Sequence, residues 1–138
     1  MPHRTVQGDP AAPGAAVGCA LQQTHEVEIG EIVPVNERAH EREVAHTALA
    51  GAAIALRRVA AGLSPDEASI IEAGVLMAGD PALLSAVDDG IEADGLPAAQ
   101  AILRATRQLA DAIASIGDEL LAARADDVRS LGRRAAWL

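Results

Sequence analysis

The hydrophobic and polar positions divide the chain into a short first part and a long second part. Over residues 8–35, Gly and Pro recur at turn spacing and polar residues alternate with β-branched ones, which predicts short strands and loops. From Asn36 onward, apolar residues recur at spacings of three and four, which is typical of amphipathic helices. The pattern therefore predicts an N-terminal arm over residues 1–35 and a helical domain over residues 36–138.

Start and stop signals mark the first two helices of this domain. Asn36 is a candidate N-cap for the first helix, and Gly62 is placed to end it. The second helix opens with "SPDE" at residues 64–67, in which Ser is the N-cap, Pro is the first helical residue and Glu closes a capping box. The same device recurs at "GDP", residues 79–81, so a break is expected there and a short helix after it.

Two further breaks complete the helical pattern. Gly95 with Pro97 separates the short helix from a long third one, and the last helix is expected to start near Asp118. On the last helix, Arg129 and Arg133 fall on the side opposite the apolar stripe. Because the connections are short, neighbouring helices should pack antiparallel. The predicted fold class is all-α: an antiparallel four-helix bundle with a broken second helix and a short N-terminal β/loop arm.

The second helix is apolar on nearly every side. In "ASIIEAGVLMAG", residues 68–79, Glu72 is the only charged residue. Such a helix is either wholly buried or has one apolar face committed to a partner outside its own bundle. The flanking acids Asp66, Glu67 and Asp80 favour the second alternative, because an apolar centre with a charged rim is typical of protein interfaces.

The negative net charge limits which classes of binding partner fit this chain. The net charge is −9, and residues 59–103 hold eight acidic residues and no Lys or Arg. Such a balance argues against nucleic acid and against an anionic membrane as partners. A solvated acidic face and a docking surface for a basic protein remain as alternatives.

The cysteine content and the lack of a membrane or signal pattern bear on the cellular location, and the N-terminal arm bears on the oligomeric state. Cys19 is the single cysteine, which excludes an internal disulfide and fits a reducing compartment. The sequence shows neither an apolar run of about 18 residues nor a signal-peptide pattern, so the prediction is a cytoplasmic protein with no membrane contact. A homo-oligomer formed through the arm of residues 1–35 is a further alternative.

Candidate catalytic and metal-binding patterns are weak. Two Glu-x-x-His pairs, Glu37 with His40 and Glu43 with His46, are similar to the pairs that di-iron bundles place on two different helices. Here both pairs fall on one helix, six residues apart, a rotation of about 240° that keeps them from converging. Solvated surface residues are the better interpretation, although a metal-binding bundle remains an alternative function.

Three segments resemble the N-terminal region of Enzyme I, the phosphoenolpyruvate–protein phosphotransferase of the bacterial sugar phosphotransferase system. These are "GDPAAPGAAVGCAL" (residues 8–21), "IIEAGVLMAGDPALLSAV" (residues 70–87) and "DELLAARADDVRSLGRRAA" (residues 118–136). The last segment is the most specific of the three, and together they cover residues 8–136. A similar Enzyme I-like segment occurs in the multiphosphoryl protein of dihydroxyacetone kinases.

The resemblance implies a fold and a function. It implies that residues 36–138 form a helical subdomain that binds the phosphocarrier protein HPr, and that residues 1–35 contain the first strand of a phosphohistidine α/β domain. In that family the active-site His stands in a Gly-Gly-x-Thr-Ser-His motif, which this sequence lacks. We therefore expect a docking module that is not catalytic alone and ends before the catalytic domain. We expect no cofactor in this chain, because Mg²⁺ and phosphoenolpyruvate would bind elsewhere in the full-length family.

The resemblance also implies which residues contact HPr. By position they are Asp66, Glu67, Leu76, Met77, Asp80, Leu83 and Arg124. The sequence departs from the family pattern in this region: Gly74 stands where the family usually has His, and Gly79 where it often has Glu. A degenerate fragment that no longer binds HPr is therefore a third alternative. No catalytic residue and no metal ligand are predicted.

Overall fold

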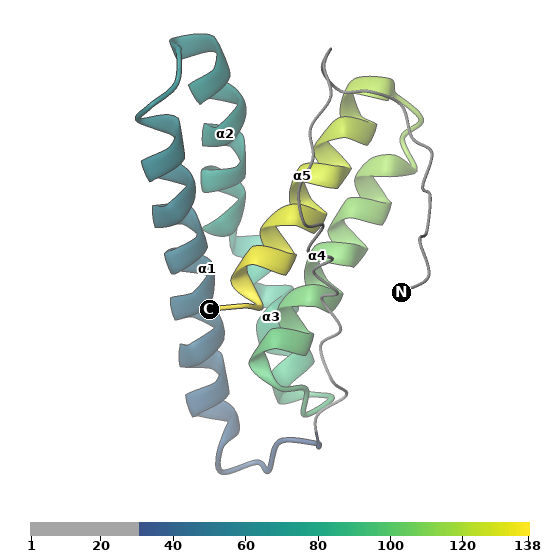
Figure 1. Cartoon of the computed structure of the whole chain (residues 1–138). Coiled ribbons are helices and arrows are strands. Elements are labelled where there is room, and N and C mark those ends of the chain that lie inside the picture. The colour runs from purple at the N-terminus through teal and green to yellow at the C-terminus, as the bar shows by residue number, and fades with distance from the viewer. Residues whose placement is uncertain (1–30) are drawn as a thin grey trace, which may run out of the picture.

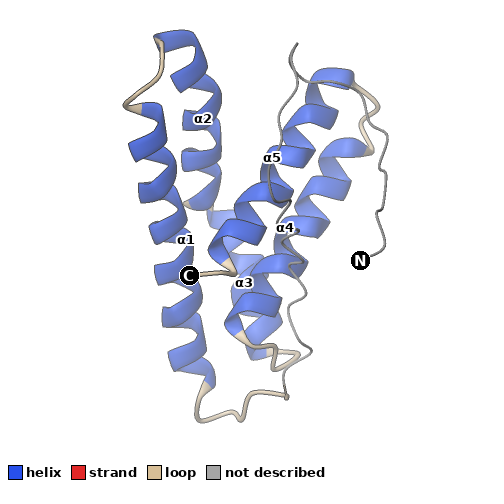
Figure 2. Cartoon of the chain, viewed as in Figure 1, coloured by secondary structure: helices blue, strands red, loops and turns tan. Residues whose placement is uncertain are grey.

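The computed structural model describes residues 31–138, apart from the side chains of Glu119 and Leu120. Figure 2 shows that the described part is helical and contains no strand, which confirms the all-α fold class. Residues 1–30, which hold most of the predicted arm, lie outside the described residues, and residues 31–37 precede the first helix. The helices are α1 (Arg38–Ala60), α2 (Pro65–Ala78), α3 (Pro81–Glu92), α4 (Ala98–Ala114) and α5 (Glu119–Ala135).

The five helices form two hairpins joined by α3. Figure 1 shows α1 beside α2 and α4 beside α5, with α3 following α2 into the lower part of the molecule, where it packs against α4 and α1. The two hairpins diverge with distance from α3, so the bundle is closed at one end and splayed at the other. The predicted antiparallel course holds within each hairpin, because short connections return the chain along the preceding helix.

The predicted break in the second helix is confirmed at Gly79. Helices α2 and α3 meet there at an angle of 43°. The Asp80 carboxylate accepts hydrogen bonds from the backbone N–H groups of Ala82 (2.8 Å) and Leu83 (3.3 Å), which caps the new helix. Pro81 at the first helical position has no N–H to leave unsatisfied. In the described part no single helix has the length and hydrophobicity of a membrane span, although α2 and α3 pass that test when counted together.

The first helix begins later than the sequence pattern indicates. Its N-cap is Glu37 rather than Asn36, and no side chain caps this end. A turn closed by the Glu37 N–H and the Pro34 carbonyl (2.9 Å) precedes the helix and takes Asn36 out of the capping position. Backbone contacts with Pro34 therefore decide this boundary rather than the side chain of Asn36.

The core lies where α3 closes the bundle. Its largest buried side chains come from four helices, and burying one of them contributes about 1.5–3 kcal/mol. Ala residues fill the positions between them, which allows the helices to approach closely. The largest fully buried side chains, by decreasing volume, are Leu49, Leu83, Ile91, Ile102, Val87, Val128 and Thr106; of these, Val128 belongs to a second cluster with Ala110 and Ala125.

Polar contacts fix the closed end of the bundle. The Glu41 carboxylate accepts a hydrogen bond from the Ala98 N–H at the start of α4 (2.7 Å). The Val33 N–H donates to the Gly95 carbonyl (2.8 Å), which ties the segment before α1 to the α3–α4 loop. Gly95 has a φ of 65°, a conformation that side-chain-bearing residues rarely adopt. These contacts hold α1 and α4 in place and thereby orient both hairpins.

Candidate functional site

Glu67 is fixed at the N-terminus of α2 by Ser64. Its carboxylate accepts hydrogen bonds from the Ser64 hydroxyl (2.6 Å) and from the Ser64 backbone N–H (3.1 Å). The hydroxyl contact and then the N–H contact lower the pKa of Glu67 below its ordinary value of 4.5, because both donors favour the charged form. The predicted role of Glu67 in the capping box is thus confirmed. One acid of the predicted HPr-binding set has a fixed position and keeps its charge.

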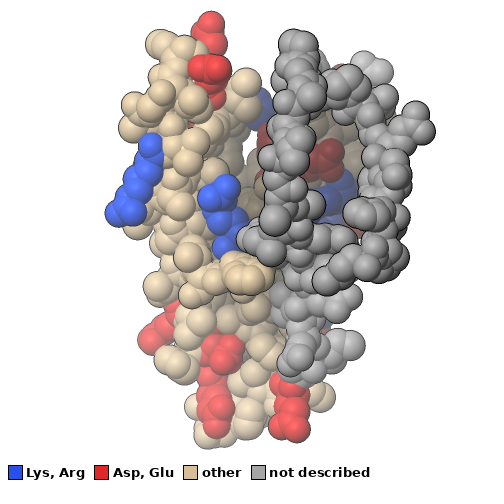
Figure 3. All heavy atoms as spheres, in the orientation of Figure 1, with Lys and Arg blue, Asp and Glu red and all other residues tan. Residues whose placement is uncertain are grey.

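The other two acids of the predicted HPr-binding set, Asp66 and Asp80, are exposed on either side of the apolar segment. Asp66 follows Pro65 in the first turn of α2 and is exposed, and Asp80 caps α3. Negative charge at a helix N-terminus is also favoured by the helix dipole. Figure 3 shows acidic side chains gathered at the loop end of the α1–α2 hairpin and again at the opposite end of the molecule. At the two ends of α2 itself, the negative charge comes from Asp66 and Glu67 in the first turn and from Asp80 just after the last.

Replacing Ser64 by Ala is expected to raise the pKa of Glu67, because it removes the hydroxyl donor that lowers it most. Because the pKa of Glu67 is lower in the folded state, its ionised carboxylate stabilises the fold. This stabilisation is complete above the unfolded pKa of about 4.5 and is lost as the pH falls from there through the lower pKa of the folded state. In Ser64→Ala this acid-dependent contribution should be smaller. NMR titration of the Glu67 carboxyl group would measure it. Ser69→Ala, on the same helix, is the control, and an unchanged titration in Ser64→Ala would contradict the assignment.

Leu76 and Met77 occupy different environments. Leu76 is 76% exposed, whereas Met77 is partly buried and packs against both hydrophobic clusters found in residues 31–138. Ile70, which the sequence analysis did not select, is 54% exposed. It precedes Met77 by seven residues, a spacing that places both on one side of a helix and that could have identified it. The second helix is therefore not wholly buried, and it presents apolar surface between its acidic ends.

Leu83 requires a correction. It was expected to contact HPr, but only 2% of it is exposed, and it packs in the core with Val87 and Ile91. These three residues are four apart, so they share the buried side of α3. The bend at Asp80 turns that side toward α1 and α4. Leu83 therefore supports the position of α3 and offers no side chain to a partner.

Arg124 connects α5 to α2. Its guanidinium Nη1 lies 3.3 Å from the Asp127 carboxylate, one turn further along α5, and 3.4 Å from the Ile70 carbonyl on α2. The structure therefore brings Arg124 to the exposed apolar part of α2, the face on which the family resemblance placed it. Arg124 also reaches across the splayed side of the bundle between the two hairpins.

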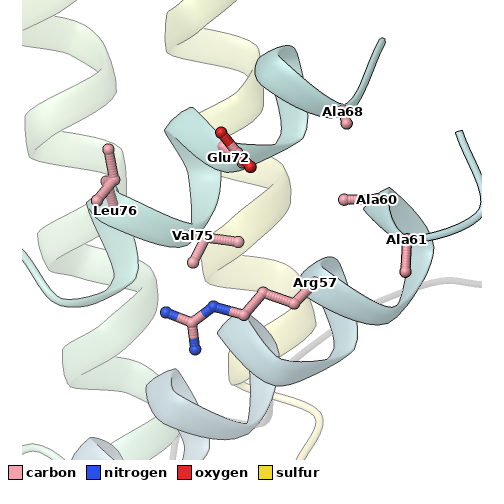
Figure 4. A pocket seen from close by; sticks show the side chains of 7 residues that line it. All are labelled: Arg57, Ala60, Ala61, Ala68, Glu72, Val75 and Leu76. Atoms are coloured by element: carbon pink, nitrogen blue, oxygen red, sulfur yellow. The ribbon is translucent and has the colours of Figure 1, made fainter. Parts of the chain in front are cut away.

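A groove of about 450 Å³ runs between the C-terminal half of α1 and α2. It continues through Arg57 and Val75 into a second depression of about 330 Å³ beside Ile54, which is 50% exposed. Leu76 lines the first of these two depressions, so the apolar surface of α2 extends onto α1. The sequence pattern did not indicate this extension. Figure 4 shows the groove residues Arg57, Ala60, Ala61, Ala68, Glu72, Val75 and Leu76.

The histidines of the Glu-x-x-His pairs do not form a metal centre within the described residues. His46 Nε2 lies 2.8 Å from the Asp88 carboxylate on α3, and His40 is exposed. No group of three His, Cys, Asp or Glu residues that could hold a metal ion occurs in residues 31–138. The His46–Asp88 contact joins α1 to α3 and explains this histidine as a structural surface residue.

Comparisons with known proteins agree with this geometry. The family described as PEP-utilising enzyme, N-terminal, matches residues 7–124. A phosphoenolpyruvate-protein phosphotransferase of Staphylococcus carnosus (strain TM300) is 33% identical over 72 residues, which are 52% of this chain and 13% of that protein. A solution NMR structure of an Enzyme I protein superimposes with a TM-score of 0.74 at 26% identity, covering 80% of this chain and 47% of that one. The chain thus spans less than half the length of either relative.

Proposed function

This chain belongs to the PEP-utilising enzyme N-terminal family, and we propose that it is the HPr-docking part of an Enzyme I-type phosphoenolpyruvate–protein phosphotransferase. The observation that carries the proposal is the exposed apolar surface of α2 between two fixed carboxylates. Leu76 is 76% exposed, Glu67 is held at one end of α2 by Ser64, and Asp80 is held at the other as the cap of α3. An apolar centre with an acidic rim fits a carrier whose contact surface is apolar and basic.

The proposed contact set follows from exposure. Asp66, Glu67, Leu76 and Asp80 are exposed, and Arg124 is partly exposed and reaches the Ile70 carbonyl. Met77 contributes the part of its side chain that remains exposed to solvent. Ile70, which is exposed, replaces Leu83 in the proposed set. Residues 36–138 would then form the docking subdomain, and residues 1–35 would belong with the phosphohistidine domain.

The role we propose in the reaction is positioning. Transfer of a phosphoryl group between two histidines needs both side chains in line, and a docking surface contributes that alignment without taking part in bond formation. The four histidines of this sequence are His3, His25, His40 and His46, and none stands in a Thr-Ser-His motif. We propose that the phosphohistidine, Mg²⁺ and phosphoenolpyruvate belong to parts of a cytoplasmic phosphotransfer system outside residues 1–138.

NMR titration of the isotope-labelled chain with HPr, at low and at high salt, tests the proposal. We expect shifts confined to residues 64–87 and the surroundings of Arg124, and weaker binding at high salt because the rim is acidic. A small basic protein of unrelated fold serves as the control for non-specific charge attraction. The absence of shifts at either salt concentration would reject HPr docking and favour the degenerate fragment.

A further inference from the structure

A small cleft lies between the two hairpins, next to the proposed docking surface. It has a volume of about 110 Å³ and opens between α1, α2 and α5. Gly74 forms part of its wall on α2. A Cβ built at Gly74 would meet a single side chain within 4 Å, the Leu56 Cδ1 at 3.4 Å. The missing side chain at position 74 therefore helps to leave the cleft open. The lining residues are Leu56, Ile70, Ile71, Gly74, Asp127, Ser130, Leu131 and Arg134.

The lining favours an aliphatic group. Leu56, Ile70, Ile71 and Leu131 supply apolar walls from three helices, and the polar residues of α5 supply the remaining wall. An apolar protein cavity of about 150 Å³ holds a benzene molecule, so this cleft has room for a branched aliphatic side chain. Burying such a side chain from a partner contributes about 1.5–3 kcal/mol of transfer free energy.

The cleft is continuous with Arg124 of the proposed docking surface. Arg124 contacts the backbone carbonyl of Ile70 and the carboxylate of Asp127, and both residues also line the cleft. A protein that contacts Arg124 and the exposed part of α2 would therefore lie beside the cleft opening. This continuity is what connects the cleft with HPr docking.

We propose that the cleft at Gly74 receives an apolar side chain of the docked HPr-type carrier and thereby selects among carriers. The inference rests on the proposed function. Charge favours the carrier over a second copy of this chain: a second copy, with a net charge of −9, would bring like charge against the acids at both ends of α2. Gly74, which stands where the resembling family usually has His, then becomes the residue that sets specificity.

Filling the cleft in the full chain tests the proposal. Gly74→Met and, independently from α5, Ser130→Leu should each weaken HPr binding about tenfold, as expected when one apolar contact is lost. Gly74→Ala is the matched control. Its Cβ makes an ordinary contact with Leu56, so binding should be retained and α2 stabilised by about 0.5–1 kcal/mol. Thermal unfolding of each variant shows whether it is folded. If Gly74→Met does not fold, Ser130→Leu still tests whether filling the cleft weakens binding.

The outcomes separate this inference from the proposed function. If the unmodified chain binds HPr and both filled variants bind equally well or more tightly, the cleft is not a specificity pocket, although docking stands. If the unmodified chain does not bind HPr, both proposals fail. Sedimentation of the unmodified chain tests whether a second copy of the chain occupies the cleft instead. Self-association that Gly74→Met abolishes would assign the cleft to a second copy and overturn the inference.

Discussion

Replacing Asp66 and Asp80 together by Asn should lower the association rate with HPr about tenfold at low ionic strength, because rim charges chiefly change the rate of encounter. Both carboxylates are exposed at opposite ends of α2, where their fields act in the same direction on an approaching cation. Asn caps a helix about as well as Asp, so the cap of α3 should survive the substitution. The loss therefore reports on charge rather than on folding.

Stopped-flow association at several salt concentrations would measure this effect. The association rate of the unmodified chain should fall steeply as the salt concentration rises, and that of the double variant should fall less steeply. The matched control is Glu43→Gln with Asp89→Asn, which removes the same number of charges from exposed residues of α1 and α3 that form no ion pair with described residues. Equal slowing of both double variants would mean that net charge alone governs encounter and would contradict a localised docking surface.

Gly132→Ala should destabilise the fold by about 1–3 kcal/mol, the usual cost of overpacking a closely packed interface. Gly132 on α5 is buried against Thr106 on α4, and a Cβ added there would overlap the Thr106 hydroxyl and lie 2.8 Å from the Thr106 Cβ. Thr106 is only 1% exposed, and its hydroxyl donates to the Ile102 carbonyl at 2.8 Å. Rotation of the Thr106 side chain would not relieve the overlap, so the two helices must separate.

Denaturant unfolding of Gly132→Ala would measure the change as a lower midpoint with an unchanged slope. Gly74→Ala, where the added Cβ makes an ordinary contact, should shift the midpoint the other way, since Ala favours a helix by up to about 1 kcal/mol over Gly. Adding Thr106→Ala should restore part of the loss by removing the overlapping hydroxyl and methyl groups. A Gly132→Ala variant as stable as the unmodified chain would show that the α4–α5 contact is looser than described.

The close approach of α4 and α5 also matters for the proposed function. It fixes the rotation of α5 about its axis, and that rotation carries Arg124 to the Ile70 carbonyl. A variant that separates α4 from α5 should therefore weaken HPr binding as well as stability. Gly132 thus acts on the docking surface only through the position of α5.

Local signals predicted the helix ends correctly where a side chain bonds to nearby backbone. The cap formed by Ser64 with Glu67 and the cap formed by Asp80 both depend on contacts within three residues, so they can be recognised in the sequence. The prediction for Asn36 was wrong because backbone contacts with Pro34 shifted the start of α1. These caps also identify two acids of the candidate site, Glu67 and Asp80, from the sequence alone.

Contacts between helices could not be predicted in the same way. The guanidinium of Arg129 bonds to Asp111 on α4 (2.8 Å) and to Asp126 (2.9 Å), which raises the pKa of Arg129. The sequence pattern placed Arg129 away from the apolar stripe of α5 but did not identify Asp111 as its partner. Leu83 was expected at the surface and lies in the core. The burial of Leu83 and the pairing of Arg129 with Asp111 both depend on which side of a helix faces its neighbour, and that is set by partners far away in the sequence.

The sequence by itself determined the helical class, the break at Gly79, the capping residues of α2 and α3 and the concentration of acids around the second helix. Each of these follows from propensity, periodicity or bonds between near neighbours. Only the tertiary structure decided that Leu76 is exposed while Leu83 is buried, that Arg124 reaches Ile70, and that a cleft remains open at Gly74. The physical reason is that these features depend on how the hairpins rotate and diverge, which is set by packing among helices far apart in the chain.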